Sequence, residues 1–144
     1  MEQEIKTVLE TINQQVKELS AFYHRAASRY NISGNEFWVW YALLVLDGEQ
    51  SQQSICEMWS LPKQTVNSVI SSMVKKGHVY LEVIPGTRNK KVIRLTPAGQ
   101  EFGTQVITRI YSAEQHALEC MTFEERQHCA SLLTKYTDLL RKEL

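Results

Sequence analysis

The chain lacks the features that mark most enzymes, and it has no excess of charge of either sign. Its 16 Lys and Arg residues balance 16 Asp and Glu residues over 144 positions. The six glycines are scattered, so there is no glycine-rich loop to hold a phosphate or a dinucleotide. A nucleophile elbow and a pair of catalytic carboxylates are also missing. We therefore expect neither enzymatic activity nor a bound cofactor.

Cysteine and long apolar runs are scarce as well. Cys56, Cys120 and Cys129 form neither a CxxC motif nor a disulfide framework, which favours a reducing compartment. The N-terminal sequence MEQEIKTVLE is acidic and polar, unlike a signal peptide. The longest apolar run, residues 37–46, is too short to cross a bilayer and indicates a buried helix. We expect a soluble, cytoplasmic protein with no membrane partner.

The neutral total hides an uneven distribution of charge. Residues 61–96 contain a single acid, Glu82, against seven cations, a local excess of six positive charges that the rest of the chain cancels. The cations are Lys63, Lys75, Lys76, Arg88, Lys90, Lys91 and Arg94. A basic patch on an otherwise acidic protein is the footprint expected of a polyanion-binding site.

The first part of the chain predicts two helices. Residues 4–29 keep an amphipathic stripe with no internal glycine or proline. After a break, Ser33 and Glu36 have the spacing of a capping box and begin a second helix. That helix is apolar on nearly every side, so we expect it at the centre of the fold.

Two short helices joined by a tight turn come next. The first covers about residues 51–59, and Pro62 opens the second in its first turn, before the sequence Lys75-Lys76-Gly77 ends it. The second helix is expected to bury Val66, Val69, Ile70, Met73 and Val74. Its opposite face carries Gln64, Ser68, Ser71 and Lys75, flanked by Asn67, with no carboxylate. Such a face can read the DNA major groove, so the pair indicates a helix-turn-helix.

A β-hairpin with a basic tip is predicted after the helix-turn-helix. Residues 78–84 and 91–95 alternate apolar and polar side chains, and the turn between them has the sequence PGTRN at residues 85–89. A basic hairpin in this place is the wing of a winged helix.

The last two helices are predicted to start at Thr96, with Pro97 behind it, and at the Thr122–Glu125 capping box. Their apolar stripes, like that of the first helix, have no further domain to cover, and they most simply pair with a second copy. The expected organisation is a single domain, residues 1–144, with a winged-helix DNA-binding lobe at about 33–96 and dimerisation helices at about 1–30 and 97–144.

With this order of elements, the chain resembles the MarR family of winged-helix transcription regulators over nearly its whole length. The similarity rests on the segment SICEMWSLPKQTVNSVISSMVKKGHV, on the basic hairpin, and on the exit IRLTPAGQE into a long helix. The resemblance implies a homodimer built from the first, fifth and sixth helices. It also implies major-groove reading by the fourth helix, a wing along the minor groove and, in many relatives, release of DNA by a small molecule or an oxidant.

The chain departs from that family at three places. Family wings often carry an acid followed by two arginines, and the corresponding residues are Thr87, Arg88 and Asn89. Arg88 is therefore the candidate minor-groove residue, backed by the two lysines that follow. Pro62 replaces the usual hydroxyl or acidic cap of the recognition helix and removes a possible phosphate contact. No cysteine precedes Cys56, so the oxidant-sensing mechanism of one subgroup is not expected.

We predict a dimeric, sequence-specific DNA-binding transcription regulator that represses from a pseudo-palindromic operator and is relieved by a small-molecule or other effector. The predicted DNA-binding residues are Lys63, Gln64, Thr65, Asn67, Ser68, Ser71, Lys75, Arg88, Asn89, Lys90 and Lys91. Candidate effector-binding residues come from the aromatic-rich neighbourhood of the second helix and the end of the first: Tyr23, Arg25, Tyr30, Trp38 and Tyr41. Ordinary core packing is the alternative for each aromatic residue.

Two other functions remain as alternatives. A winged helix can serve as a protein-interaction module, and the neutral total charge is compatible with that. His116 and Cys120, with His128 and Cys129 shortly after, could hold zinc in a metal-responsive regulator. Solvated histidines and packed cysteines explain the same residues, and we predict no metal.

Overall fold

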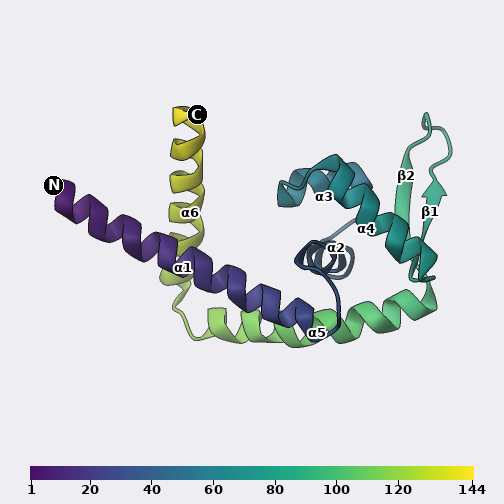
Figure 1. Ribbon diagram of the computed structural model, residues 1–144, viewed down its shortest axis with the longest axis horizontal. Helices are drawn as coiled ribbons and strands as arrows, with labels where there is room; N and C mark the ends of the chain where they lie inside the picture. The colour runs from purple at the N-terminus through teal and green to yellow at the C-terminus, as the bar shows by residue number, and fades with distance from the viewer. The chain divides into compact units, whose positions relative to one another are not determined.

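Six helices and one two-stranded antiparallel sheet make up the chain (Figure 1), and the computed structural model describes all 144 residues. The elements in order are α1 (Glu2–Ser28), α2 (Gly34–Val45), α3 (Gln52–Trp59), α4 (Lys63–Lys75), β1 (Val79–Val83), β2 (Lys91–Leu95), α5 (Pro97–Glu119) and α6 (Phe123–Glu143). Residues Met1–Ile107 form one compact unit and Thr108–Leu144 form a second, so α5 continues from the first unit into the second. The predicted mainly helical winged-helix architecture is confirmed.

Helix α2 lies at the centre of the first unit, as its apolar sequence predicts. Phe37, Val39, Trp40 and Ala42 are each 0% exposed. The predicted capping box at its start is only half formed. The Ser33 hydroxyl accepts a hydrogen bond from the Glu36 backbone N–H at 3.1 Å, but the Glu36 carboxylate accepts one from the indole N–H of Trp40 instead of returning to Ser33. The prediction of a reciprocal box was therefore wrong.

Helices α3 and α4 form the predicted helix-turn-helix. Ser51 and Ser54 close a capping box at the start of α3, and Ser60 takes a left-handed conformation (φ 52°) that turns the chain toward α4. Pro62 is the N-cap residue of α4, one position earlier than predicted.

The buried side of α4 consists of Val66, Ile70 and Met73, at 0%, 1% and 0% exposure. Val74, which we predicted to be buried, is 41% exposed. Val74 follows the exposed Asn67 by seven residues, and such residues share a side of a helix, so it lies at the edge of the buried stripe.

The hairpin follows α4 at once, and its register pairs Val79 with Leu95 and Leu81 with Ile93. Val79 and Ile93 lie on one face of the hairpin and Val92 lies on the other, and all three are at most 5% exposed. The backbone N–H of Ile93 also donates to the carbonyl of Gln50 at 2.9 Å. The segment between α2 and α3 is thereby attached to the free edge of β2.

The start of α5 is attached to the junction between α4 and β1. The Thr96 hydroxyl donates to the carbonyl of Gly77 at 2.6 Å and accepts from the Gly99 N–H at 3.0 Å, as expected of an N-cap. A side chain at Gly99 would overlap the backbone carbonyl of His78, and one at Gly103 would come within 2.7 Å of the Trp40 ring. Both positions therefore require glycine for close packing.

In the second unit, α6 begins at a complete capping box, as predicted. Thr122 accepts from the Glu125 N–H at 3.1 Å, and the Glu125 carboxylate accepts from the Thr122 N–H at 2.8 Å. The hydrogen bonds from the backbone and side chain of Thr122 lower the pKa of Glu125.

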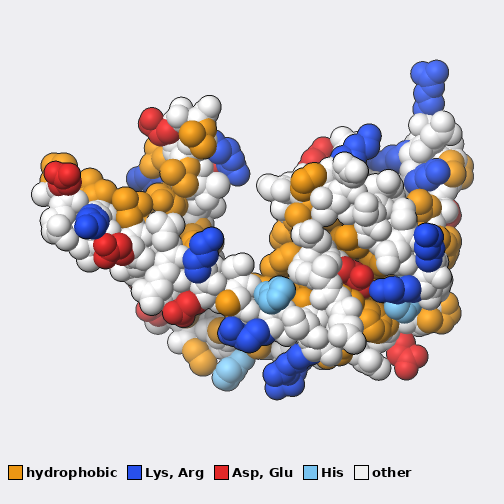
Figure 2. Space-filling view, viewed as in Figure 1, with side chains coloured by type: hydrophobic (Ala, Val, Ile, Leu, Met, Phe, Trp, Pro, Cys, Tyr) orange, Lys and Arg blue, Asp and Glu red, His pale blue; other side chains and the backbone are white.

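Two helices carry apolar stripes that the single chain leaves exposed. On α6, Leu132 and Leu133 are 61% and 57% exposed, and no residue of this helix is buried. On α1, the exposed apolar residues are Ile5, Val8, Leu9, Val16, Leu19 and Phe22. Figure 2 shows hydrophobic side chains along both helices. No helix in the structure has the length and apolar character needed to span a membrane.

Candidate nucleic-acid interface

The polar face of α4 is open to solvent. Six of the seven predicted DNA-binding residues of this helix are exposed: Lys63, Gln64, Asn67, Ser68, Ser71 and Lys75. The seventh, Thr65, is half-buried because it lies at the edge of the side that faces the core. The face carries hydroxyl, amide and ammonium groups and no carboxylate, so it can hydrogen-bond to base edges without repelling phosphate.

The first turn of α4 has no side-chain cap. Pro62 has an extended conformation (φ −60°, ψ 144°), and no side chain accepts a hydrogen bond from the first-turn N–H groups. These N–H groups lie at the positive end of the helix dipole. They are therefore available to a phosphate, although the side chain of Pro62 is not.

The tip of the wing is held by its own hydrogen bonds. The Thr87 N–H and hydroxyl both reach the carbonyl of Ile84, at 3.3 and 2.7 Å, and Gly86 has a positive φ of 81° that suits this turn. Asn89 is also left-handed, at φ 63°. The Thr87 hydroxyl thus closes the turn that carries Arg88.

The hairpin tip gathers cations at its end. Arg88, Lys90 and Lys91 are all exposed, and Asn89 between them is exposed too. Figure 2 shows Lys and Arg side chains at the top of the hairpin, where Figure 1 places its turn. No Asp or Glu occurs in the turn.

Two of the seven cations counted in the sequence are neutralised by carboxylates. Arg94 donates to Glu82 on β1 at 2.8 Å and to Glu49 before α3 at 2.7 Å. These hydrogen bonds, first that to Glu82 and then that to Glu49, raise the pKa of Arg94. Lys76 faces the buried Glu36 at 3.7 Å. Five cations of residues 61–96 therefore have no carboxylate partner: Lys63, Lys75, Arg88, Lys90 and Lys91.

The sequence contains a signal for only part of these ion pairs. Tyr80 pairs with Arg94 in the hairpin register, and Glu82 is the diagonal neighbour of Arg94 on the same face. Arg94 and Glu49 are 45 positions apart in the sequence, and no local sequence pattern predicts their contact.

Three of the five candidate effector-binding residues come together in one aromatic cluster. The ring centroid of Trp38 lies 4.8 Å from that of Tyr23 and 5.3 Å from that of Tyr41. Trp59, at the end of α3, joins them with its ring 5.0 Å from Trp38. The indole N–H of Trp59 is buried and has no hydrogen-bond acceptor. Trp59 belongs to the same aromatic-rich neighbourhood in the sequence, beyond the five residues named above.

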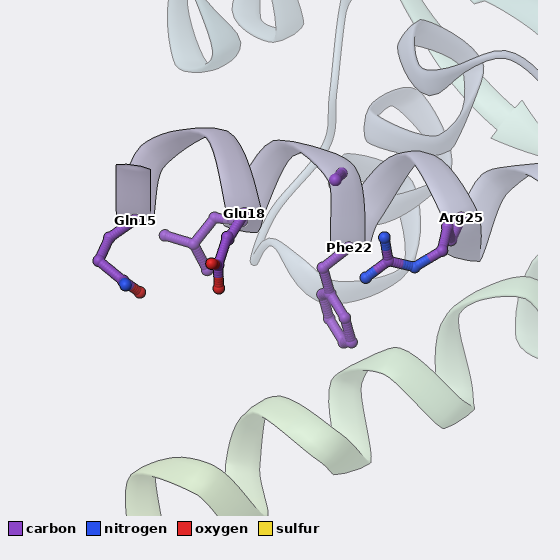
Figure 3. Close-up of a pocket in the computed structure, with 6 residues that line it drawn as sticks. Gln15, Glu18, Phe22 and Arg25 are labelled. Atoms are coloured by element: carbon purple, nitrogen blue, oxygen red, sulfur yellow. The ribbon is translucent and has the colours of Figure 1, made fainter. Parts of the chain in front are cut away.

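The other two candidates lie elsewhere. The Tyr30 hydroxyl donates to the carbonyl of Gln105 at 2.9 Å, and its ring contacts Phe102 edge-on. Arg25 is exposed on α1, where it lines a groove of about 440 Å³ with Gln15, Glu18, Leu19, Ala21 and Phe22. Figure 3 shows that the labelled residues of this groove all come from α1. Tyr30, which contacts Phe102 and Gln105 on α5, therefore packs apart from the Trp38 cluster.

The cysteines and histidines near the α5–α6 turn do not form a metal site within one chain. The Cys120 thiol lies 3.9 Å from Nε2 of His116, which is a weak hydrogen-bond contact. No group of three or more His, Cys, Asp or Glu side chains is placed to hold a metal ion. Cys120 and Cys129 are both exposed, so packing in the core does not explain them in the single chain.

Comparison with known proteins agrees with this arrangement. The model of the family described as the sugar-specific transcriptional regulator TrmB matches residues 27–98, which is half of the chain. A comparison of the sequence with curated proteins found no match. The solved structures below are each less than 25% identical in sequence to this chain.

Three structures illustrate the likeness. NMB1585, a MarR family regulator from Neisseria meningitidis, has a TM-score of 0.80 at 20% identity, with 94% of each chain covered. The MepR–DNA complex of S. aureus has a TM-score of 0.68 at 17% identity, covering 91% of this chain and 96% of that one. The organohalide-sensing regulator RdhR, in its 2,4-dichlorophenol-bound form, has a TM-score of 0.65 at 19% identity. The match covers 93% of this chain and 80% of the RdhR chain.

The exposed carboxylate-free helix, the basic wing and the shared fold define the architecture, a winged helix with the MarR fold. The family match over residues 27–98 makes the chain a DNA-binding transcription regulator. The predicted resemblance to MarR regulators is thereby confirmed. By the match over residues 27–98, the chain belongs to the TrmB family of transcriptional regulators.

Proposed function

We propose that the protein is a homodimeric repressor that binds a pseudo-palindromic operator and is released from it by a small-molecule effector. The observation that carries this proposal is the carboxylate-free, exposed face of α4 followed directly by a hairpin whose tip bears three free cations. In this proposal the α4 face reads bases in the major groove, Lys75 contacts a phosphate, and Arg88 enters the minor groove. Lys90 and Lys91 add charge along the DNA backbone.

The proposed dimer follows from the exposed apolar faces of α1 and α6. A monomer rarely leaves contiguous apolar surface of this extent in water. A two-fold dimer presents two copies of α4, and the operator half-sites are then expected about one helical turn of DNA apart.

Selection of bound duplexes from a random DNA pool tests the function directly. We expect recovery of an inverted repeat with half-sites about 10 base pairs apart, centre to centre. Placed across a promoter, this duplex should make transcription in vitro fall as the protein is added. A pool that stays random after repeated rounds would contradict sequence-specific binding.

The contact surface is tested by Arg88→Ala and Lys75→Ala. Each change should weaken operator binding and reduce the slope of log affinity against log salt by about 0.9 per protomer, the value of one lost phosphate contact. The measurement is fluorescence anisotropy at several salt concentrations. Lys142→Ala, which removes a charge far outside residues 61–96, should leave the slope unchanged. Equal slopes for wild type and both variants would refute the proposed surface.

We propose the Trp38 cluster as the effector site, with Tyr23, Tyr41 and Trp59 around it. The unpaired indole N–H of Trp59 supports this placement because a buried donor is stabilised by any ligand that brings an acceptor. The relative bound to dichlorophenol shows that a protein of this fold can hold a small aromatic molecule.

This site is tested with a compound that releases the protein from its operator, found by screening planar molecules with hydrogen-bond acceptors. Trp59→Phe keeps the aromatic ring and removes the donor, so it should raise the dissociation constant for that compound by about tenfold, the usual loss for one hydrogen bond. Operator affinity without the compound should not change. Isothermal titration calorimetry measures the dissociation constant of the compound. If Trp59→Phe leaves it unchanged, the effector site lies away from Trp59.

A further inference from the structure

Two consecutive lysines at the end of α4 have different surroundings. Both side chains are exposed in part, but Lys75 has no ion-pair partner, whereas Nζ of Lys76 lies 3.7 Å from Oε1 of Glu36. Lys75 is the last residue of the helix and Lys76 is its C-cap. Lys75 is thus an unpaired cation, whereas the next residue, Lys76, is paired with Glu36.

Glu36 is the only buried charged residue of the chain, with its side chain 9% exposed. It lies in the first turn of α2, where the helix dipole favours a negative charge. Its Oε2 accepts a hydrogen bond from the Trp40 indole N–H at 3.1 Å, and its Oε1 faces Lys76. The two oxygens therefore face different elements of the fold.

Trp40 connects this carboxylate to the middle of the core. The ring is fully buried and lies 5.5 Å from Phe102 on α5 and 5.6 Å from His78, between α4 and β1. Through Trp40 and Lys76, Glu36 joins the core to the far end of α4. A buried carboxylate is retained only with a counter-charge, and Lys76 is the cation that faces it.

We propose that Glu36 and Lys76 form a positioning pair that fixes the orientation of α4 on DNA, so that Lys76 anchors the helix and does not contact phosphate. The proposal rests on the proposed sequence-specific DNA binding. Base contacts from one face of a helix depend on its rotation and tilt, whereas non-specific attraction to phosphates depends mainly on charge. Loss of the pair therefore weakens specific binding and leaves non-specific binding unchanged.

The test compares Lys76→Gln with Lys75→Gln, a matched control one residue away. The probes are the duplex recovered by selection and a shuffled duplex of the same length. Lys75→Gln should reduce the salt slope on both duplexes by about 0.9 per protomer. Lys76→Gln should leave both slopes unchanged and weaken binding to the selected duplex alone, by about tenfold.

Glu36→Gln completes the cycle, since glutamine can still accept from Trp40 but carries no charge. It should match Lys76→Gln, and the double variant should lose no more than either single one. A lower salt slope for Lys76→Gln, or tighter binding by Glu36→Gln, would show that Lys76 contacts phosphate and overturn the proposal. Equal losses on both duplexes would also overturn it, because a smaller folded fraction weakens both together.

A measurement without DNA separates this inference from the proposed function. The indole N–H resonance of Trp40, identified by its loss in Trp40→Phe, should shift in Lys76→Gln and stay in place in Lys75→Gln. If this resonance does not shift in Lys76→Gln, the proposed Glu36–Lys76 pair is refuted, whether or not the protein binds DNA. Wild-type protein that does not distinguish the two duplexes refutes the proposed function, and the resonance still decides whether Lys76 is bound to Glu36.

Discussion

Replacing Trp40 with alanine should lower the free energy of unfolding by about 3–5 kcal/mol, the usual loss for a large aromatic residue removed from a core. Trp40 is 0% exposed and packs on α5 so closely that Gly103 has no room for a side chain. The change also removes the hydrogen-bond donor of the buried Glu36 carboxylate. Chemical denaturation at a fixed protomer concentration measures this loss, because the proposed dimerisation would make apparent stability depend on concentration.

Trp40→Phe is the matched control for this prediction. Phenylalanine keeps most of the ring and removes the indole N–H. Trp40→Phe should therefore lower the free energy of unfolding by much less than Trp40→Ala, and its effect should come mainly from the Glu36 carboxylate oxygen that loses its hydrogen bond. If Trp40→Ala were no more destabilising than an average surface substitution, within about 0.5 kcal/mol of wild type, the central place of Trp40 in the core would be wrong.

Leu133→Lys combined with Leu140→Lys should dissociate the proposed dimer. These residues are 57% and 48% exposed in the single chain and lie two turns apart on the apolar side of α6. Each leucine is already about half covered in the single chain, so its burial in the dimer is worth about 1 kcal/mol. A dimer contains four of these side chains, so their loss should raise the dimer dissociation constant about a thousandfold. Sedimentation equilibrium measures the mass, and operator binding should fall with it.

Gln127→Lys combined with Thr134→Lys is the control for the dimer prediction. It introduces the same charges at the same spacing on the opposite, polar side of α6, where both residues are exposed. The control should remain dimeric. A leucine variant that keeps the wild-type mass would show that this face of α6 is not the interface.

The local signals of the sequence were enough to predict the order of the elements. Thr96 and Thr122 form the expected caps because an N-cap depends on residues three positions away. The reading face of α4 could also be predicted, since helical spacing alone places Gln64, Ser68 and Ser71 together and opposite the core.

The rest depends on contacts between distant segments. Glu36 has the spacing of a capping residue, yet the buried Trp40 and the end of α4 bind its carboxylate instead. Arg94 counts as a free cation in the sequence, but Glu49 approaches it only after the chain has folded. In the same way, Tyr30 is aromatic and near the cluster in sequence, but Phe102 and Gln105 draw it to α5.

The close approach of Gly99 to the carbonyl of His78 has a mechanical consequence. Together with the Thr96 hydroxyl on Gly77, it joins the first turn of α5 to the base of the wing and the end of α4. We therefore expect these segments to move together. In the proposed dimer, any hinge that adjusts the separation of the two α4 helices is therefore expected further along α5, beyond Gly103.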